Sequence, residues 1–195
     1  MKYDIVLAGV GGQGVLSLSA IIASGAMKEG LFVKQSEVHG MSQRGGAVLA
    51  NLRLSDKPIA SDLIPGGAAA LILSMEPLES LRYLSYLSPD GALITSITPV
   101  VNIPDYPDLE QLLAKIRSVP GAILVDSDHL AKAAGSPRAA NMVMVGAASH
   151  LLPVKVDTME HYIEGLFKKK GDKVVEVNLK AFRAGREAFA RERHA

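Results

Sequence analysis

The chain has 195 residues, the size of a single domain, and 48% of them are hydrophobic, which is enough for a buried core and excludes a disordered chain. Its 21 Lys and Arg residues nearly balance 20 Asp and Glu residues, so the net charge of +1 gives no electrostatic reason to expect a nucleic-acid partner. The absence of cysteine excludes disulfides, a thiol nucleophile and any iron–sulfur cluster ligated by cysteines of this chain.

No targeting segment or membrane span is evident in the sequence. The first four residues carry charges of both signs before a short apolar run, and Gly9 interrupts that run, unlike in a secretory signal peptide. No apolar stretch reaches the roughly 18 residues that cross a bilayer. We therefore expect a cytoplasmic protein with no membrane partner.

Short apolar runs alternate with helix-like segments along the whole chain. In chain order, the patterns predict a strand at 3–8, a helix at 15–27, strands at 31–37, 47–54 and 70–73, a helix from 74, a strand at 92–95, a helix at 109–116, a strand at 122–126, and helices at 126–134, 139–152, 158–167 and 177–191. This alternation predicts one α/β domain over residues 1–195, with a Rossmann-like, doubly wound and mostly parallel sheet flanked by helices.

The helix expected from residue 74 has start and stop signals of its own. Pro77 stands in the first turn, where its missing N–H costs little. We interpret Glu76 before it as favourable to the helix dipole, with hydrogen bonds from the loop at 39–46 as the alternative. Residues 89–91, Pro-Asp-Gly, are expected to end this helix in a turn. Its inward face would consist of Leu78, Leu81, Leu84 and Leu87.

The turn after the first strand has the spacing G-x-G-x-x-G at Gly9, Gly11 and Gly14, with Gly12 and Gln13 inside it. In such a turn the first glycine permits the bend, the second lets a ligand approach the backbone, and the third allows close packing of helix on strand. The free N–H groups at the helix start attract phosphate. A tight turn that holds no ligand would explain the same glycines.

Glu37 lies 23 residues after Gly14, near the end of the second predicted strand. This spacing suits an acid that binds a ribose hydroxyl, so a stand-alone NAD- or nucleotide-binding protein is one alternative. Against a dehydrogenase, little chain remains for a substrate domain. An adenylating enzyme of the ubiquitin-activating type is disfavoured, because it would carry downstream arginines, an acidic metal ligand and often cysteines.

A second Gly-rich segment follows the second predicted strand. Its candidate ligand-binding residues are His39, Gly40, Gln43, Arg44, Gly45 and Gly46. Loops at the carboxyl ends of strands converge on one cleft, so this loop should face the first one. Arg44 offers a fork for phosphate or carboxylate, or a salt bridge to Glu37 or a partner subunit. We interpret His39 as a loop histidine bonded to a backbone carbonyl, because no partner base is identifiable.

Two long motifs in this order, GVGGQG at 9–14 and EVHGMSQRGG at 37–46, resemble the gamma-type domain of the 2-oxoacid:ferredoxin oxidoreductases. The segment MEPLESLRYL at 75–84 is similar to the beta subunit of the branch that acts on indolepyruvate, and NMVMVGA at 141–147 is similar to a late helix of that branch. The resemblance covers nearly the whole chain, from Tyr3 to the final helix.

The resemblance implies an accessory subunit of a complex that oxidatively decarboxylates an arylpyruvate such as indolepyruvate with coenzyme A and reduces ferredoxin. It implies that thiamine diphosphate, magnesium and the 4Fe-4S clusters reside in a larger alpha subunit, so no metal and no catalytic residue is assigned to this chain. The two Gly-rich loops would contact the coenzyme A phosphates or close the active site of the partner.

Three alternatives stay open: the gamma subunit of a complex that acts on pyruvate, 2-oxoglutarate or ketoisovalerate; a stand-alone NAD- or nucleotide-binding protein; and a regulatory module that binds an adenine nucleotide. Outside the two loops, Asn141 could cap or orient a loop, and its neighbour Arg138 is a second candidate for the anionic ligand or a subunit contact. We interpret the three lysines at 168–170 as a solvated helix end, with ferredoxin docking as the alternative.

Overall fold

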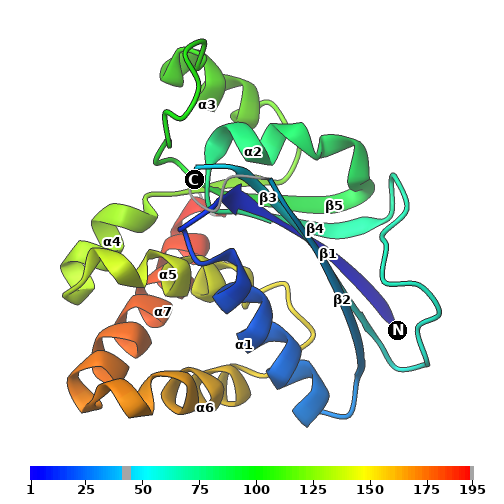
Figure 1. The fold of residues 1–195 in the computed structure, drawn as a ribbon, viewed down its shortest axis with the longest axis vertical. Helices are drawn as coiled ribbons and strands as arrows, with labels where there is room; N and C mark the ends of the chain where they lie inside the picture. The colour runs from blue at the N-terminus through cyan, green and yellow to red at the C-terminus, as the bar shows by residue number, and fades with distance from the viewer. Residues whose placement is uncertain (41–44, 194–195) are drawn as a thin grey trace.

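The computed structural model of the chain describes residues 1–40 and 45–193, and six strands in these residues form one sheet. Its spatial order is β2-β3-β1-β4-β5-β6 (Figure 1). The strands are β1 Lys2–Val10, β2 Phe32–His39, β3 Ala47–Ser55, β4 Ala69–Ser74, β5 Leu87–Ser96 and β6 Ala122–Val125. The ladders β1–β4, β4–β5 and β5–β6 are parallel, whereas β3 is antiparallel to both β1 and β2. The predicted α/β class with a mostly parallel sheet is confirmed.

β1 lies inside the sheet and is buried on both faces, as its apolar run predicts. Residues 5–8 have no exposed surface. Ile5 pairs with Leu52 of β3 on one side and with Leu71 of β4 on the other. Because β1 has a neighbouring strand on each side, the Gly-rich turn that follows it lies near the middle of the row of strand ends, and not beside an edge strand.

Helices cover both faces of the sheet (Figure 1). The described residues form α1 Val15–Lys28, α2 Pro77–Arg82, α3 Leu109–Arg117, α4 Ser127–Ala134, α5 Ala140–Ala148, α6 Val156–Phe167 and α7 Asp172–Glu192, with 3-10 turns at Leu84–Tyr86, Pro137–Ala139 and Lys168–Lys170. α2 and α3 pack over a small core on one face, and α1 with α4–α7 pack over a larger core on the other. In this described part, no helix combines the length and the apolar character that a bilayer crossing requires.

α5 lies at the centre of the larger layer, and every one of its residues is buried. The prediction of a central apolar helix is confirmed, although the helix ends earlier than expected. α5 crosses α7 through two glycines. A Cβ on Gly146 would overlap the carbonyl group of Phe182, and a Cβ on Gly185 would overlap that of Val143. The two helix backbones are therefore in direct contact, which only residues without a side chain permit.

The helix predicted to run up to the Pro-Asp-Gly sequence at 89–91 is shorter than expected. α2 ends at Arg82, a 3-10 turn follows, and β5 already begins at Leu87. The predicted helix stop is wrong, because residues 89–91 lie inside β5, whose pairing with β4 is irregular at this point. A Cβ on Gly91 would lie 2.7 Å from the Ala69 carbonyl oxygen, so this glycine allows close strand pairing rather than a turn.

Candidate functional site

The two predicted Gly-rich loops meet at the sheet edge where β1 ends. The amide of Gly11 donates to the carbonyl oxygen of Gly46 at 2.8 Å, and the amide of Gly45 donates to the carbonyl oxygen of Gly11 at 3.3 Å. These bonds extend the antiparallel ladder of β1 and β3 beyond the ends of both strands. The prediction that the two loops face each other is confirmed. We call residues 9–14, 40 and 45–46 the Gly-rich edge.

Gln13 braces the first loop from within. Its Oε1 accepts a hydrogen bond from the Val10 amide at 2.8 Å, and its Nε2 donates to the Met75 carbonyl oxygen at 3.0 Å. The side-chain amide thereby joins the end of β1 to the residues before α2. Gly9 lies in β1 rather than in the bend, which corrects its expected role. A Cβ on Gly9 would lie 3.0 Å from Gln13 Oε1, so this glycine makes room for the brace.

The bend itself depends on Gly12 and Gly14, whose φ angles are +103° and +81°. This left-handed region is open to glycine and strained for other residues. Gly14 also faces α5, because a Cβ there would lie 2.9 Å from Asn141 Nδ2. The third glycine of the motif therefore makes room for a side chain of a helix, rather than for close packing of α1 on β1 as expected.

Backbone N–H groups at the start of α1 remain available to a ligand. Those of Gly12, Gly14, Val15 and Leu16 have no hydrogen-bond acceptor within residues 1–40 and 45–193. They lie beside a shallow pocket of about 300 Å³ whose far wall is Val48. No acidic side chain stands in the first turn of α1. Because such amides carry partial positive charge, the arrangement suits a phosphate group.

The second loop is held by the β2–β3 hairpin, and His39 is the last residue of β2. The amide of Gly40 donates to the Ala47 carbonyl oxygen at 3.2 Å, which continues the hairpin ladder into the loop. The side chain of His39 and the whole of Gln43 and Arg44 lie outside the described residues. The positive charge that Arg44 would bring to the Gly-rich edge therefore stays a prediction.

Glu37 does not lie where a dinucleotide-binding acid belongs. In a dinucleotide fold that acid ends the parallel strand next to β1. Here the neighbour of β1 is the antiparallel β3, and Glu37 lies beyond it on β2, the edge strand. Gln35 Nε2 donates to Glu37 Oε2 at 3.5 Å. The spacing from Gly14 suggested a ribose contact because spacing alone does not reveal a strand inserted between two others.

Glu76 organises a third segment near this edge. Its side chain is 1% exposed, and its Oε2 accepts from the Glu79 amide at 2.8 Å, which caps α2. Its Oε1 accepts from the Val100 amide at 3.2 Å and from the Tyr106 hydroxyl. Burial and this hydrogen bond raise the pKa of Tyr106 above its usual range. Besides the predicted dipole role, Glu76 thus anchors the connection at 97–108.

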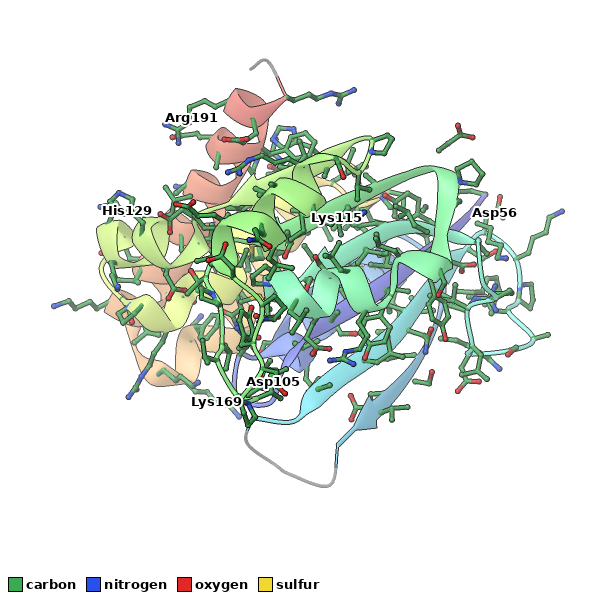
Figure 2. The ribbon with its side chains drawn as sticks, turned by 90° about the horizontal axis from the view of Figure 1, so that it is seen from above. Asp56, Asp105, Lys115, His129, Lys169 and Arg191 are labelled. Carbon is green, nitrogen blue, oxygen red and sulfur yellow. The ribbon has the colours of Figure 1, made fainter. Side chains whose placement is uncertain are left out.

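This connection reaches the second Gly-rich loop. Asn102 Nδ2 donates to the carbonyl oxygen of Gly45. Asp105 of the same connection lies well apart from Asp56, which follows β3 (Figure 2). Asn102 belongs to none of the motifs recognised in the sequence. A polar residue in a Pro-rich connection after a parallel strand was the only signal that could have indicated it.

Large apolar side chains are exposed around the Gly-rich edge. Val101 and Ile103, on either side of Asn102, are 71% and 42% exposed. Leu16, in the first turn of α1, is 42% exposed, and Val38, one residue before the end of β2, is 62% exposed. We call these four residues the apolar rim. Exposed apolar side chains that gather around a loop cluster are typical of an interaction surface.

The remaining candidates lie behind the Gly-rich edge. Asn141 contacts Gly14, as described above, and Arg138 and Lys170 line a separate pocket between α1, α5 and α7. Among the residues that the structure describes, no three His, Asp or Glu side chains are grouped so that they could hold a metal ion.

Comparisons with known proteins agree with this architecture. The family described as pyruvate ferredoxin/flavodoxin oxidoreductase matches residues 4–188. The indolepyruvate oxidoreductase subunit IorB of Archaeoglobus fulgidus is 37% identical over 194 residues, which cover 95% of this chain and 94% of that protein.

Two solved structures share the fold. The gamma subunit of the keto/oxoacid ferredoxin oxidoreductase of Geobacter sulfurreducens aligns with a TM-score of 0.71 at 25% identity, over 97% of this chain and 99% of that chain. The 2-oxoglutarate:ferredoxin oxidoreductase of Magnetococcus marinus, solved with 2-oxoglutarate, coenzyme A and succinyl-CoA, aligns with a TM-score of 0.79 at 24% identity, over 97% of this chain but 31% of that chain. The chain therefore belongs to the pyruvate ferredoxin/flavodoxin oxidoreductase family.

Proposed function

We propose that the chain is the accessory subunit of a complex that oxidatively decarboxylates arylpyruvates such as indolepyruvate. The complex converts the arylpyruvate, coenzyme A and oxidised ferredoxin into an arylacetyl-coenzyme A, carbon dioxide and reduced ferredoxin, so the electrons released from the broken carbon–carbon bond pass to ferredoxin. The observation that carries this proposal is the 37% identity to the Archaeoglobus subunit over 95% of the chain.

In this proposal the larger alpha subunit holds thiamine diphosphate, magnesium and the 4Fe-4S clusters. The chain has no cysteine with which to ligate a cluster. Its one Asp-Gly pair, Asp90-Gly91, lies within β5 rather than in a loop that could present a carboxylate to a metal-bound cofactor. The contribution of this chain is therefore to bind and position coenzyme A and to enclose the active site of the alpha subunit.

Coenzyme A would place a phosphate group at the Gly-rich edge. The amides of Gly12, Gly14, Val15 and Leu16 lack an acceptor in the described chain, and phosphate oxygens accept several such bonds at once. A Cβ on Gly12 would meet no atom within 4 Å, so the backbone there is open from outside. Arg44, if it faces this pocket, adds the charge that a phosphate needs.

The apolar rim would dock against the alpha subunit. Leu16, Val38, Val101 and Ile103 border the Gly-rich edge, and burial against a partner removes their apolar surface from water. Ferredoxin would be met through the assembled complex. The even charge of the chain gives no attraction to nucleic acid or to an anionic membrane, and we place the complex in the cytoplasm.

A pair of matched glycine substitutions tests this assignment. Gly12 and Gly30 have φ angles of +103° and +83°, and a Cβ on either would meet no atom within 4 Å, so Gly12→Asp and Gly30→Asp impose similar backbone strain. Each variant is expressed with the alpha subunit and assayed for indolepyruvate-dependent reduction of a viologen dye. We expect Gly12→Asp to raise the KM for coenzyme A about tenfold, and Gly30→Asp to leave it unchanged.

The two parts of the proposal fail separately. A purified wild-type complex that does not turn over any arylpyruvate would overturn the function. Normal turnover with an unchanged KM for coenzyme A in Gly12→Asp would retain the function and remove the coenzyme A contact. In that case the available amides would serve the partner subunit.

A complex that acts on another 2-oxoacid is the second candidate, favoured by the shared fold with the 2-oxoglutarate:ferredoxin oxidoreductase of Magnetococcus. Comparing kcat/KM for indolepyruvate, pyruvate, 2-oxoglutarate and ketoisovalerate decides between the two candidates. The stand-alone NAD-binding alternative is disfavoured by the position of Glu37 beyond β3. Reduction of NAD by the isolated chain would support the stand-alone alternative again.

A further inference from the structure

A pocket of about 430 Å³ lies on the helical face, separated from the Gly-rich edge by Asn141. Its walls come from α1, the 3-10 turn at Pro137–Ala139, α5, the turn at Lys168–Lys170 and α7. This is the size of a cavity that holds a small metabolite.

Three cations line this pocket and no carboxylate does. They are Arg138, Lys170 and Lys173. None of their side chains forms an ion pair or a hydrogen bond with any residue that the structure describes. Lys170 Nζ lies 5.4 Å from the centre of the Phe167 ring. Three like charges gathered without a counter-charge favour a ligand with more than one negative charge.

Asn141 supplies a buried donor on the same wall. Its side chain is only 9% exposed, and its Oδ1 already accepts a hydrogen bond from the Met142 amide at 3.0 Å. Its Nδ2 has no acceptor among the described residues, although it lines the pocket. An amide N–H that lines a pocket and has no acceptor among the described residues can donate to an oxygen of a bound ligand.

The rest of the lining is largely apolar. Its apolar side chains are those of Ala139, Phe167, Val174 and Val177, and Ser17, Ser136 and Asn178 add uncharged polar groups. An inorganic anion would leave the apolar side chains uncovered, whereas a ligand with a flat, weakly polar body would cover them. The pocket therefore combines recognition of several negative charges with recognition of an apolar body.

We propose that this pocket binds a nucleoside carrying two or more phosphates, with the phosphates on Arg138, Lys173 and the Asn141 amide and the base against Phe167. This chemistry has two sources, a free nucleotide or the nucleotide end of coenzyme A. The proposal does not rest on the function proposed above, because neither the pocket nor its test requires the partner subunit or turnover.

The test is calorimetric titration of the full-length chain with ADP, coenzyme A and inorganic pyrophosphate. We expect ADP to bind, and Arg138→Ala and Lys173→Ala each to weaken its binding about tenfold. Lys169→Ala is the matched control, because Lys169 lies on the same 3-10 turn as Lys170 but not in the pocket lining (Figure 2). We expect this control to change ADP binding less than twofold.

Two further comparisons complete the test. Phe167→Ala should weaken ADP binding and leave pyrophosphate binding unchanged, because the ring contacts the base alone. Competition between coenzyme A and ADP would identify coenzyme A as the source, and binding of ADP without such competition would identify a free nucleotide.

Three results would overturn the proposal. They are no binding of ADP or coenzyme A at millimolar concentration, an equal effect of Lys169→Ala and Lys173→Ala, and pyrophosphate binding as tight as that of ADP. Circular dichroism and thermal unfolding of each variant separate a lost contact from a lost fold.

Discussion

Glycines act in opposite ways in two regions of this molecule. At the α5–α7 crossing, Gly146 and Gly185 bring two helix backbones into contact and leave no space between them. At the Gly-rich edge, Gly12 and Gly14 turn the chain so that backbone amides have no acceptor among residues 1–40 and 45–193 and lie beside an open pocket. The same residue type therefore serves packing in one region and recognition in the other, and only the neighbours in space distinguish the two uses.

The largest expected effect breaks the packing side of this comparison. Gly185→Ala places a Cβ on the Val143 carbonyl group, and backbone cannot move aside as a side chain can. We expect the free energy of unfolding to fall by about 3 kcal/mol, measured by urea denaturation.

Gly165→Ala is the control for this substitution. Gly165 lies in α6, and a Cβ there would meet no atom within 4 Å, so we expect a gain of about 0.5 kcal/mol from helix propensity. Equal effects of the two substitutions would show that α5 and α7 are not in backbone contact.

A smaller effect is expected when the brace of the Gly-rich edge is removed. Gln13→Ala leaves the Val10 amide and the Met75 carbonyl without their partner, at a cost of about 2 kcal/mol in the free energy of unfolding. In the assembled complex we also expect a higher KM for coenzyme A, because the turn that presents the amides is loosened.

Gln111→Ala on the exposed face of α3 is the matched control, and we expect a change within about 0.5 kcal/mol. If Gln13→Ala proved as mild as this control, the turn would be held by its glycines and backbone bonds alone.

The smallest expected effect concerns the ion pair between Arg183 of α7 and Glu160 of α6, and it measures how much charge, as opposed to packing, stabilises the position of α7. The hydrogen bond from Arg183, at 2.8 Å, lowers the pKa of Glu160 from its usual value of 4.5. A lowered folded-state pKa stabilises the fold above the unfolded pKa, and that stability is lost as the pH falls from about 4.5 through the folded value.

The Arg183 side chain is 60% exposed, so we expect Glu160→Gln to cost about 0.5 kcal/mol at pH 7. The difference from wild type should shrink as the pH falls through the lowered folded-state pKa of Glu160, below which both states carry a neutral side chain. A difference that persists unchanged in unfolding experiments at pH 3 would show that packing, rather than charge, is responsible.

The sequence was informative wherever a local pattern determines the structure. The apolar run at 3–8 and the apolar segment from 139 predict buried elements because apolar residues dominate both, although Asp4 lies in the first and Asn141 in the second. The meeting of the two Gly-rich loops was predictable because strands that run in the same direction end at the same edge of a sheet.

The order of the strands was not predictable in this way. The insertion of β3 between β1 and β2 depends on pairing between segments far apart in the chain, and the residue pattern of β3 suits either direction. The contacts of Glu76 with Val100 and Tyr106 were hidden for the same reason, since they join residues 24 and 30 positions apart. The candidate site is built from residues that are brought together by such long-range pairing. Its geometry could therefore be described only from the structure.

The position of β3 also has a consequence for the order in which the chain matures. During synthesis the Gly-rich turn leaves the ribosome well before β3. The hydrogen bond from the Gly11 amide to the Gly46 carbonyl oxygen nevertheless requires β3 and the β2–β3 hairpin to be in place. A nascent chain that ends before Ser55 therefore exposes β1 with an incomplete β3 and without β4, its two neighbouring strands. A partner subunit that docks at this edge, as proposed above, would meet the finished surface only once the hairpin has closed, which would couple subunit recognition to completed folding.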